Sequence, residues 1–234
     1  MLYISNMKKL IFVVLLLLSA HCFAGSLEGS LKDIEAEWAS IYYNMPKSKQ
    51  GTAYVELLDK TVNLARQYPN AAEPIFWQAV VKATHADQQD ALSALNAIHE
   101  ARDLLIKAIE IDPKTMDGSA YVTLGTLYYM APVWPISFGD DNAAQQMLET
   151  ALKINPDGID TNYFYGEFLM LHNRPTDAAV YFERATVAPV RTDQLYADNQ
   201  LKAEARLALK NTQERKISNG KGLFLSLFNS AGTK

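Results

Sequence analysis

Two short segments contain the residue types from which metal sites are built. HEARD at 99–103 begins like the His-Glu-x-x-His helix of zinc proteases, in which two histidines hold one ion, but Asp103 stands where the second histidine is needed. NPDGID at 155–160 has three oxygen-bearing side chains, yet it lacks the spacing of an EF-hand loop and its bidentate glutamate. We therefore expect no metal site, and we interpret 155–160 as a turn between helices.

Nothing else in the sequence supports catalysis. It contains no glycine-rich phosphate loop, no nucleophile elbow and no serine with an assignable base. His85 and His172 are isolated near predicted helix ends, where a protonated imidazole interacts favourably with the helix dipole. We expect no catalytic residue and no cofactor, so the chain is not predicted to be an enzyme.

The composition is that of a folded, acidic protein. The 234 residues are 49% hydrophobic and 21% charged, with a formal net charge of −4, which excludes a disordered chain and a strongly basic nucleic-acid binder. Cys22 is the only cysteine, so neither an intramolecular disulfide nor a cysteine-based zinc site can form.

The first 24 residues have the pattern of a secretory signal peptide. Lys8 and Lys9 precede the apolar run Leu10–Leu18, and the small residues Cys22 and Ala24 stand just before a cleavage site after Ala24. Translation can start at Met1 or Met7. The alternatives to a cleaved signal peptide are a retained membrane anchor and lipid attachment at Cys22. The apolar run is short for a membrane span, and lipid attachment needs a small residue where His21 stands. We expect export to the periplasm, with no membrane span after cleavage.

The rest of the chain is predicted to be helical and repetitive. Three segments place small, large and small residues at spacings of four and three, followed by a proline that ends the helix. Two preceding segments carry a glycine at a fixed position, which indicates close contact between helices. This is the spacing of the 34-residue tetratricopeptide repeat (TPR). The residues are Ala101, Leu105, Ala108 and Pro113; Ala144, Leu148, Ala151 and Pro156; Ala178, Phe182, Ala185 and Pro189; Tyr121, Leu124, Gly125 and Tyr128; and Asn162, Tyr165, Gly166 and Leu169.

Weaker helix patterns complete the predicted fold. Helices over 27–43 and 52–67 form one more pair, 74–86 precedes the unit that ends at Pro113, and 193–210 forms a capping helix. The predicted fold is all-α: a right-handed, TPR-like solenoid of about four helix pairs plus a C-terminal cap over 25–212. For the tail 213–234, with its apolar run 223–228, docking on the last helix, membrane contact and a loose conformation all remain open.

The candidate binding surface combines an insertion with the first helices of the repeats. Met130–Asn142 (MAPVWPISFGDDN) is longer than the repeat requires and forms either a plug over the core or one wall of a pocket. Asp140 or Asp141 is predicted to cap the next helix. First helices of such repeats line the concave face, where Val122 is also expected. The candidate binding residues are Thr126, Tyr129, Trp134, Phe138, Tyr163, Glu167 and Met170.

Several blocks resemble a family of exported proteobacterial TPR proteins. The resemblance covers Trp38 to Leu209 and is most specific in WPISFGDD and NPDGIDTNYFYG. More distantly, the insertion is similar to the proline- and glycine-rich loop in the periplasmic T component of TRAP transporters. That resemblance implies a ligand cavity and pairing with a solute-binding subunit. The chain departs from the T component in two ways, because His21 disrupts the lipoprotein signal and Gly139 replaces a double glycine.

These observations predict a periplasmic binding or scaffold module. It is expected to recognise a protein or peptide through the concave face and the insertion. The alternative is an accessory component of a TRAP-type solute transporter that holds a small apolar or carboxylate ligand and pairs with a periplasmic solute-binding protein. No nucleic-acid partner is expected, because the chain is acidic.

Overall fold

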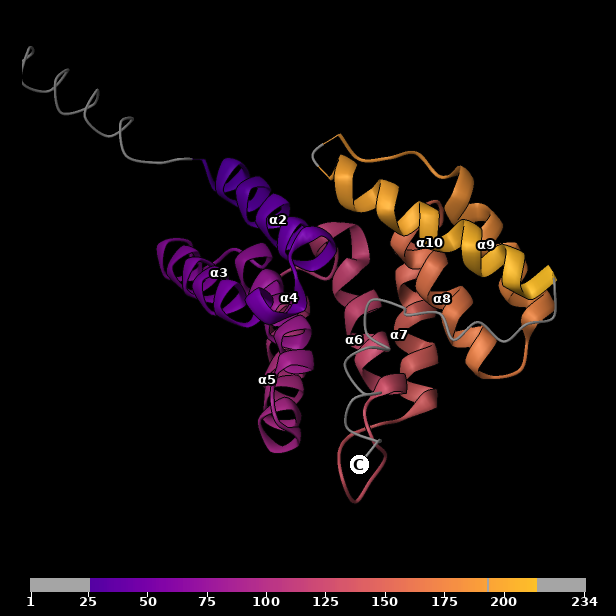
Figure 1. Ribbon diagram of the computed structural model, residues 1–234, viewed down its shortest axis with the longest axis horizontal. Helices are drawn as coiled ribbons and strands as arrows, with labels where there is room; N and C mark the ends of the chain where they lie inside the picture. The colour runs from indigo at the N-terminus through magenta and orange to yellow at the C-terminus, as the bar shows by residue number, and fades with distance from the viewer. Residues whose placement is uncertain (1–25, 193, 214–234) are drawn as a thin grey trace, which may run out of the picture.

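Helices make up all the regular structure that can be described. The computed structural model describes residues 26–192 and 194–213, and in these ranges it contains nine α-helices, two short 3-10 helices and one isolated bridge between Val133 and Gly139 (Figure 1). The predicted all-α class is confirmed for this part of the chain. The predicted signal peptide 1–24 and the apolar run 223–228 lie outside the described residues.

The first eight helices follow one another as four packed pairs. The two helices of each pair are joined by a short connection or by the insertion. The first helices touch between the first and second pairs (α2 with α4) and between the third and fourth (α6 with α8), whereas the second and third pairs meet mainly through α5 and α6. The pairs are α2 (Leu27–Asn44) with α3 (Lys47–Gln67), α4 (Glu73–His85) with α5 (Ala91–Ile111), α6 (Ser119–Met130) with α7 (Asp141–Ile154), and α8 (Ile159–Leu171) with α9 (Pro175–Val187). The 3-10 helices η1 (Ala86–Gln88) and η2 (Thr115–Gly118) lie at two of the connections, and α10 (Leu195–Gln213) stands alone at the end.

The repeated small–large–small triplets form the seams within these pairs. All nine residues of the triplets on α5, α7 and α9 are fully buried, as the spacing predicts. A Cβ atom on Gly125 would lie 2.8 Å from Leu148 Cγ, and one on Gly166 would lie 2.7 Å from Phe182 Cε1. The two glycines therefore allow the first helix of each pair to approach the large residue of the second.

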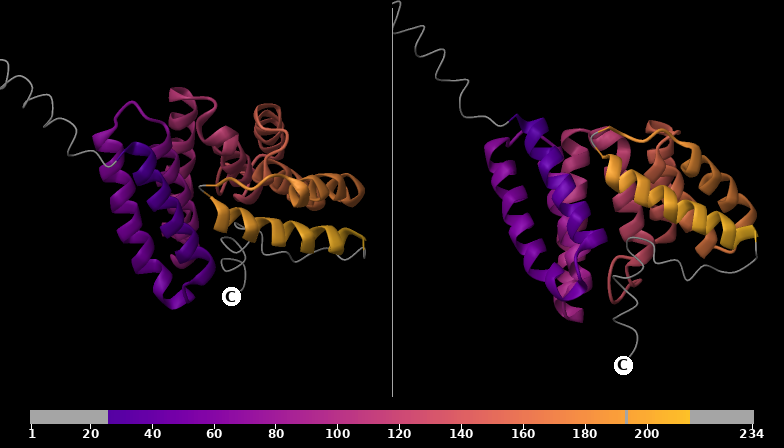
Figure 2. Two further views of the ribbon diagram at one scale, coloured as in Figure 1. Left: turned by 90° about the horizontal axis from the view of Figure 1, so that it is seen from above. Right: turned by 45° about the horizontal axis from the view of Figure 1, so that its top comes forward.

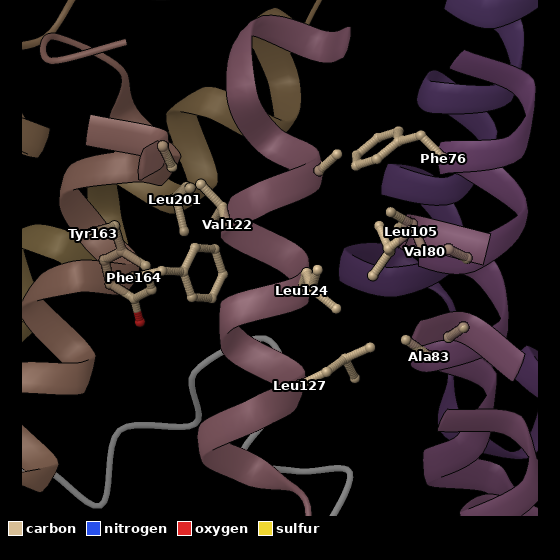
Figure 3. Packing of buried hydrophobic residues seen from close by; sticks show 14 of the residues in the cluster. Phe76, Val80, Ala83, Leu105, Val122, Leu124, Leu127, Tyr163, Phe164 and Leu201 are labelled. Atoms are coloured by element: carbon tan, nitrogen blue, oxygen red, sulfur yellow. The ribbon is translucent and has the colours of Figure 1, made fainter. Parts of the chain in front are cut away.

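The core continues across α6 from one pair to the next. On one side Leu124 and Leu127 face Val80, Ala83 and Leu105 of the α4–α5 pair (Figure 3). On the other side Val122 faces Phe164 of α8 and Leu201 of α10 (Figure 3). Because α6 is packed on both sides, the described helices share one continuous hydrophobic core.

The last helix does more than cap the stack. α10 packs along α9, but it also contacts α8 and, near its own start, α2 (Figure 2). The Tyr196 hydroxyl donates a hydrogen bond to Asn44 Oδ1 at 2.7 Å, which connects α10 to the end of α2. The groove between the first helices is therefore covered by α10 rather than open. No helix in the described ranges is both long and apolar enough to cross a membrane.

Candidate functional site

The structure divides the predicted binding residues into two groups. Tyr163 and Glu167 of α8 are buried beneath α10, and Thr126 and Tyr129 of α6 lie on the same side of the fold. Met170, at the end of α8, is half-buried. Trp134 and Phe138 lie in the insertion, where Trp134 is largely exposed and Phe138 packs against His99 of α5 and Tyr128 of α6. The predicted surface is therefore not one continuous face.

A pair of carboxyl groups lies in the covered groove. Glu167 is 7% exposed, and Glu204 reaches it from α10. The Tyr163 hydroxyl hydrogen-bonds to Glu204, whose Oε2 atom is buried without a hydrogen-bond partner among the described residues. Tyr129 completes this groove cluster, with its ring centroid 5.8 Å from that of Phe168.

Burial shifts both carboxyl groups toward the protonated form. Burial and then the charge of Glu204 raise the pKa of Glu167 to about 8. Burial raises the pKa of Glu204 to about 7, although the hydrogen bond from Tyr163 opposes this shift. Burial and the neighbouring charge of Glu167 also raise the pKa values of Tyr129 and Tyr163. The carboxyl groups of the groove cluster therefore ionise at a higher pH than ordinary glutamates.

Next to the groove cluster is a partly open pocket of about 90 Å³, lined by residues of α2, α4, α6, α8 and α10 and of the segments that precede α6 and α10. Five of its seventeen lining residues are aromatic, and these come from α2, α4 and α8. Tyr43 belongs to both features, since it lines the pocket and its pKa is raised by burial and then by the charge of Glu204. The aromatic lining residues are Trp38, Tyr43, Phe76, Trp77 and Phe164.

One wall of the pocket holds a buried ion pair. Arg191 donates to both carboxylate oxygens of Asp198, through Nη2 at 2.6 Å and through Nε at 3.2 Å. The backbone N–H of Arg191 donates to the same carboxylate at 2.7 Å. Asp160, whose carboxylate accepts a hydrogen bond from Ser119 Oγ, lies 4.0 Å from Arg191 Nη1. This network ties the start of α10 to α6 and α8.

The insertion is held in place by its own backbone hydrogen bonds and by the packing of one aromatic side chain. The backbone N–H of Gly139 donates to the Pro132 carbonyl at 2.9 Å, and that of Asp140 donates to the Tyr128 carbonyl at 3.0 Å. The Phe138 ring packs edge-on against His99 and Tyr128, and the Arg102 guanidinium lies 4.7 Å from its centroid. Phe138 therefore acts as a plug between α5 and α6.

The tip of the insertion points into solvent. Val133, Trp134 and Ile136 are 66%, 83% and 67% exposed, although all three are large apolar residues. Asp140 begins α7 by accepting hydrogen bonds from the backbone N–H groups of Asn142 and Ala143, which confirms the predicted cap. A rigid base thus presents an exposed apolar surface, hereafter the tip (Val133, Trp134 and Ile136).

The segments that resemble metal motifs have ordinary structural roles. His99 lies within hydrogen-bond distance of Ser137, with Nε2 and Oγ 3.1 Å apart. Residues 155–158 connect α7 to α8, and carbonyls of this connection accept hydrogen bonds from the side chains of Thr161 and Asn162, whereas Ile159 and Asp160, predicted as part of the turn, already belong to α8. Within the described ranges, no three histidine, cysteine, aspartate or glutamate residues lie close enough together to hold a metal ion.

Sequence reasoning missed the residues that α10 and its preceding segment bring to the site: Arg191, Asp198 and Glu204. The sequence did indicate that Glu204 is buried, because this residue lies among Leu201, Ala205 and Ala208, which form the buried stripe of α10. An acid within an apolar stripe indicates a buried carboxyl group.

Comparison with known proteins adds no assignment. No protein-family model matches this chain, and no curated protein matches it either.

Proposed function

We propose that this protein is an exported, TPR-like binding module without catalytic activity. The repeat assignment is supported by the four helix pairs, by the buried triplets and by the two glycines at the seams. Together these features are typical of a stack in which each helix pair buries its apolar face on the next.

The observation that carries the proposal is the exposure of the tip on a fixed base. Large apolar side chains gathered at the surface cost solvation free energy unless a partner covers them. Tryptophan is enriched among the residues that dominate protein interfaces, because it buries a large area at a small cost in entropy. The tip therefore has the character of a binding epitope for an apolar pocket on another protein.

The groove plays a different part in this proposal than in the sequence-based expectation. Tyr163 and Glu167 are covered by α10, so a partner has no access to them in this conformation. We assign the partner to the tip, and a periplasmic solute-binding protein is the partner class that the sequence resemblance suggests.

Site-specific photo-crosslinking tests this proposal. A photoreactive residue at position 134 should trap a partner in cells, and the same residue at position 92 serves as the control, because Leu92 is also exposed but lies on α5. Binding of the purified partner is then measured for the wild type, Trp134→Ala and Leu92→Ala. We expect Trp134→Ala to weaken binding at least tenfold and Leu92→Ala to leave it unchanged. Equal affinity for all three proteins would refute the assignment of the partner to the tip.

A further inference from the structure

The last helix is attached to the rest of the fold more firmly in its first half than in its second. Three polar contacts link the first half to other elements: Asp198 with Arg191, Tyr196 with Asn44, and Lys202 with the Ala188 carbonyl. In the second half, residues 204–213, the buried hydrophobic side chains are Ala205 and Ala208, and Leu209 is partly buried beside them. Because alanine buries little apolar surface, these contacts hold the second half weakly.

The second half also carries one member of the carboxyl pair in the groove. Glu204 interacts electrostatically with Glu167 of α8, and its Oε2 atom is buried without a hydrogen-bond partner among the described residues. Two carboxylates that lie together repel each other, and the repulsion grows where water is excluded. Ionisation of the pair therefore weakens the contact between the second half of α10 and α8.

The neighbours of the pair on three helices are tyrosines, which carry no positive charge. Each of them interacts electrostatically with Glu167, with Glu204 or with both, and they are Tyr163 of α8, Tyr129 of α6, and Tyr42 and Tyr43 of α2. The Tyr163 hydroxyl supplies a hydrogen bond to Glu204. A tyrosine hydroxyl can stabilise a carboxylate in this way, but it does not neutralise a second one.

The basic side chains on α9 and α10 lie away from the pair. On α9, which packs along α10, Arg184 is exposed next to the exposed Glu183, and its guanidinium lies 5.3 Å from the ring centroid of Tyr181. On α10, Arg206 and Lys210 are exposed, while the Lys202 ammonium group donates to a backbone carbonyl. No basic residue is among the groups that shift the pKa of either glutamate.

These contacts make the position of the second half of α10 sensitive to pH. Burial raises the pKa of Glu167 to about 8 and that of Glu204 to about 7, from an ordinary value of 4.5. On a lifted helix both groups are solvated and ionise near that ordinary value. Their protonation therefore favours the closed position fully near pH 4.5, and this contribution is lost as the pH rises to about 8.

We propose that residues 204–213 form a lid, which lifts from the groove as the carboxyl pair ionises and uncovers Tyr163 and Glu167. Both residues are buried beneath α10 in the closed position, at 2% and 7% exposure. The first half of α10 keeps its polar contacts and anchors the lid. The lid does not depend on the tip, so it stands or falls separately from the proposed partner site.

Native-state hydrogen exchange tests this proposal on the intact protein. Amides of the lid should exchange through a local opening, so their protection should be lower than that of the Leu105 and Ala108 amides of α5 and should depend little on low concentrations of urea. After correction for the intrinsic exchange rate, raising the pH from 6 to 8 should lower lid protection on the order of 100-fold. The proposal is overturned if the lid and α5 share one protection factor and one urea dependence, or if the pH leaves lid protection unchanged.

Substitutions in the carboxyl pair separate its ionisation from the ordinary fraying of a terminal helix. Glu204→Gln keeps the size of the side chain and removes one ionisable group, so the effect of pH on lid protection should fall to about tenfold. Adding Glu167→Gln should abolish the effect. Glu183→Gln, on the exposed face of α9, is the control and should retain the effect of the wild type. A double variant that keeps the full effect contradicts the proposal.

Discussion

Glu167 of α8 and Glu204 of α10 place two carboxyl groups together in the covered groove, and the charge of Glu204 raises the pKa of Glu167. No basic side chain is among the groups that shift either pKa. Protonation of these carboxyl groups therefore favours the contact between α10 and α8. Protonation couples the stability of this contact to pH.

The free energy of unfolding should fall as the pH rises from about 4.5 to about 8. Folded-state pKa values of about 8 for Glu167 and about 7 for Glu204 lie above their ordinary value of 4.5. In this range the folded protein binds more protons than the unfolded chain, so stability is fully present at low pH and is lost as the pH rises. The free energy of unfolding measured with urea should be higher at pH 5 than at pH 8 by on the order of 3 kcal/mol.

The Glu167→Gln variant identifies the source of this dependence. A neutral amide removes the need for a proton, so the variant should be more stable than the wild type at pH 8 and should lose most of the pH dependence. Glu183→Gln, on the exposed face of α9, is the control and should leave the profile unchanged. If Glu167→Gln retains the slope of the wild type, the carboxyl pair is not its cause.

Glycine-to-alanine substitutions should have opposite effects on stability at Gly166, which lies in a seam, and at Gly51, which does not. Gly166→Ala should destabilise the protein by about 1–3 kcal/mol, because its Cβ would overlap the Phe182 ring. Gly51→Ala should stabilise it by about 0.5–1 kcal/mol, since Gly51 lies within α3 and a Cβ there would come no closer than 3.9 Å to a neighbour. Chemical denaturation of both variants measures the difference. A stabilising Gly166→Ala substitution would mean that the seam is looser than described.

Substitutions in the insertion should affect stability differently at the plug residue Phe138 and at the tip residue Trp134. Phe138→Ala should cost about 2–4 kcal/mol of stability, because it removes the ring that packs on His99, Tyr128 and Arg102. Trp134→Ala should change stability by less than about 0.5 kcal/mol, since its side chain is largely in solvent. Thermal unfolding of the two variants provides the comparison. A large loss with Trp134→Ala would show that the tip is structural and would remove the main support for its binding role.

Substitutions of the two partners of the ion pair at the start of α10, Arg191 and Asp198, should have strongly non-additive effects on stability. Arg191→Ala leaves the carboxylate of Asp198, which is 1% exposed, without its bidentate partner and should cost about 3 kcal/mol. Adding Asp198→Ala should recover part of this loss, because it removes the uncompensated charge. A double-mutant cycle measures the coupling. Additive effects of the two substitutions would contradict the pairing.

The sequence alone determined the helices, their order and their seams. The triplets on α5, α7 and α9 and the glycines at 125 and 166 could be recognised because a helix brings residues three and four positions apart onto one face. The cap at Asp140 was predictable for a similar reason, since it depends on neighbouring backbone N–H groups. Local spacing therefore contained this information.

Only the tertiary structure decided what the groove contains. The contacts between Glu167 and Glu204, between Tyr196 and Asn44, and between Phe138 and His99 join residues that are far apart along the chain. They depend on the angle at which α10 crosses α8 and on the path of the insertion, which periodicity does not encode. For this reason the sequence predicted an exposed concave surface, whereas in the folded chain α10 buries Tyr163 and Glu167. Trp134, at the tip of the insertion, stays in solvent.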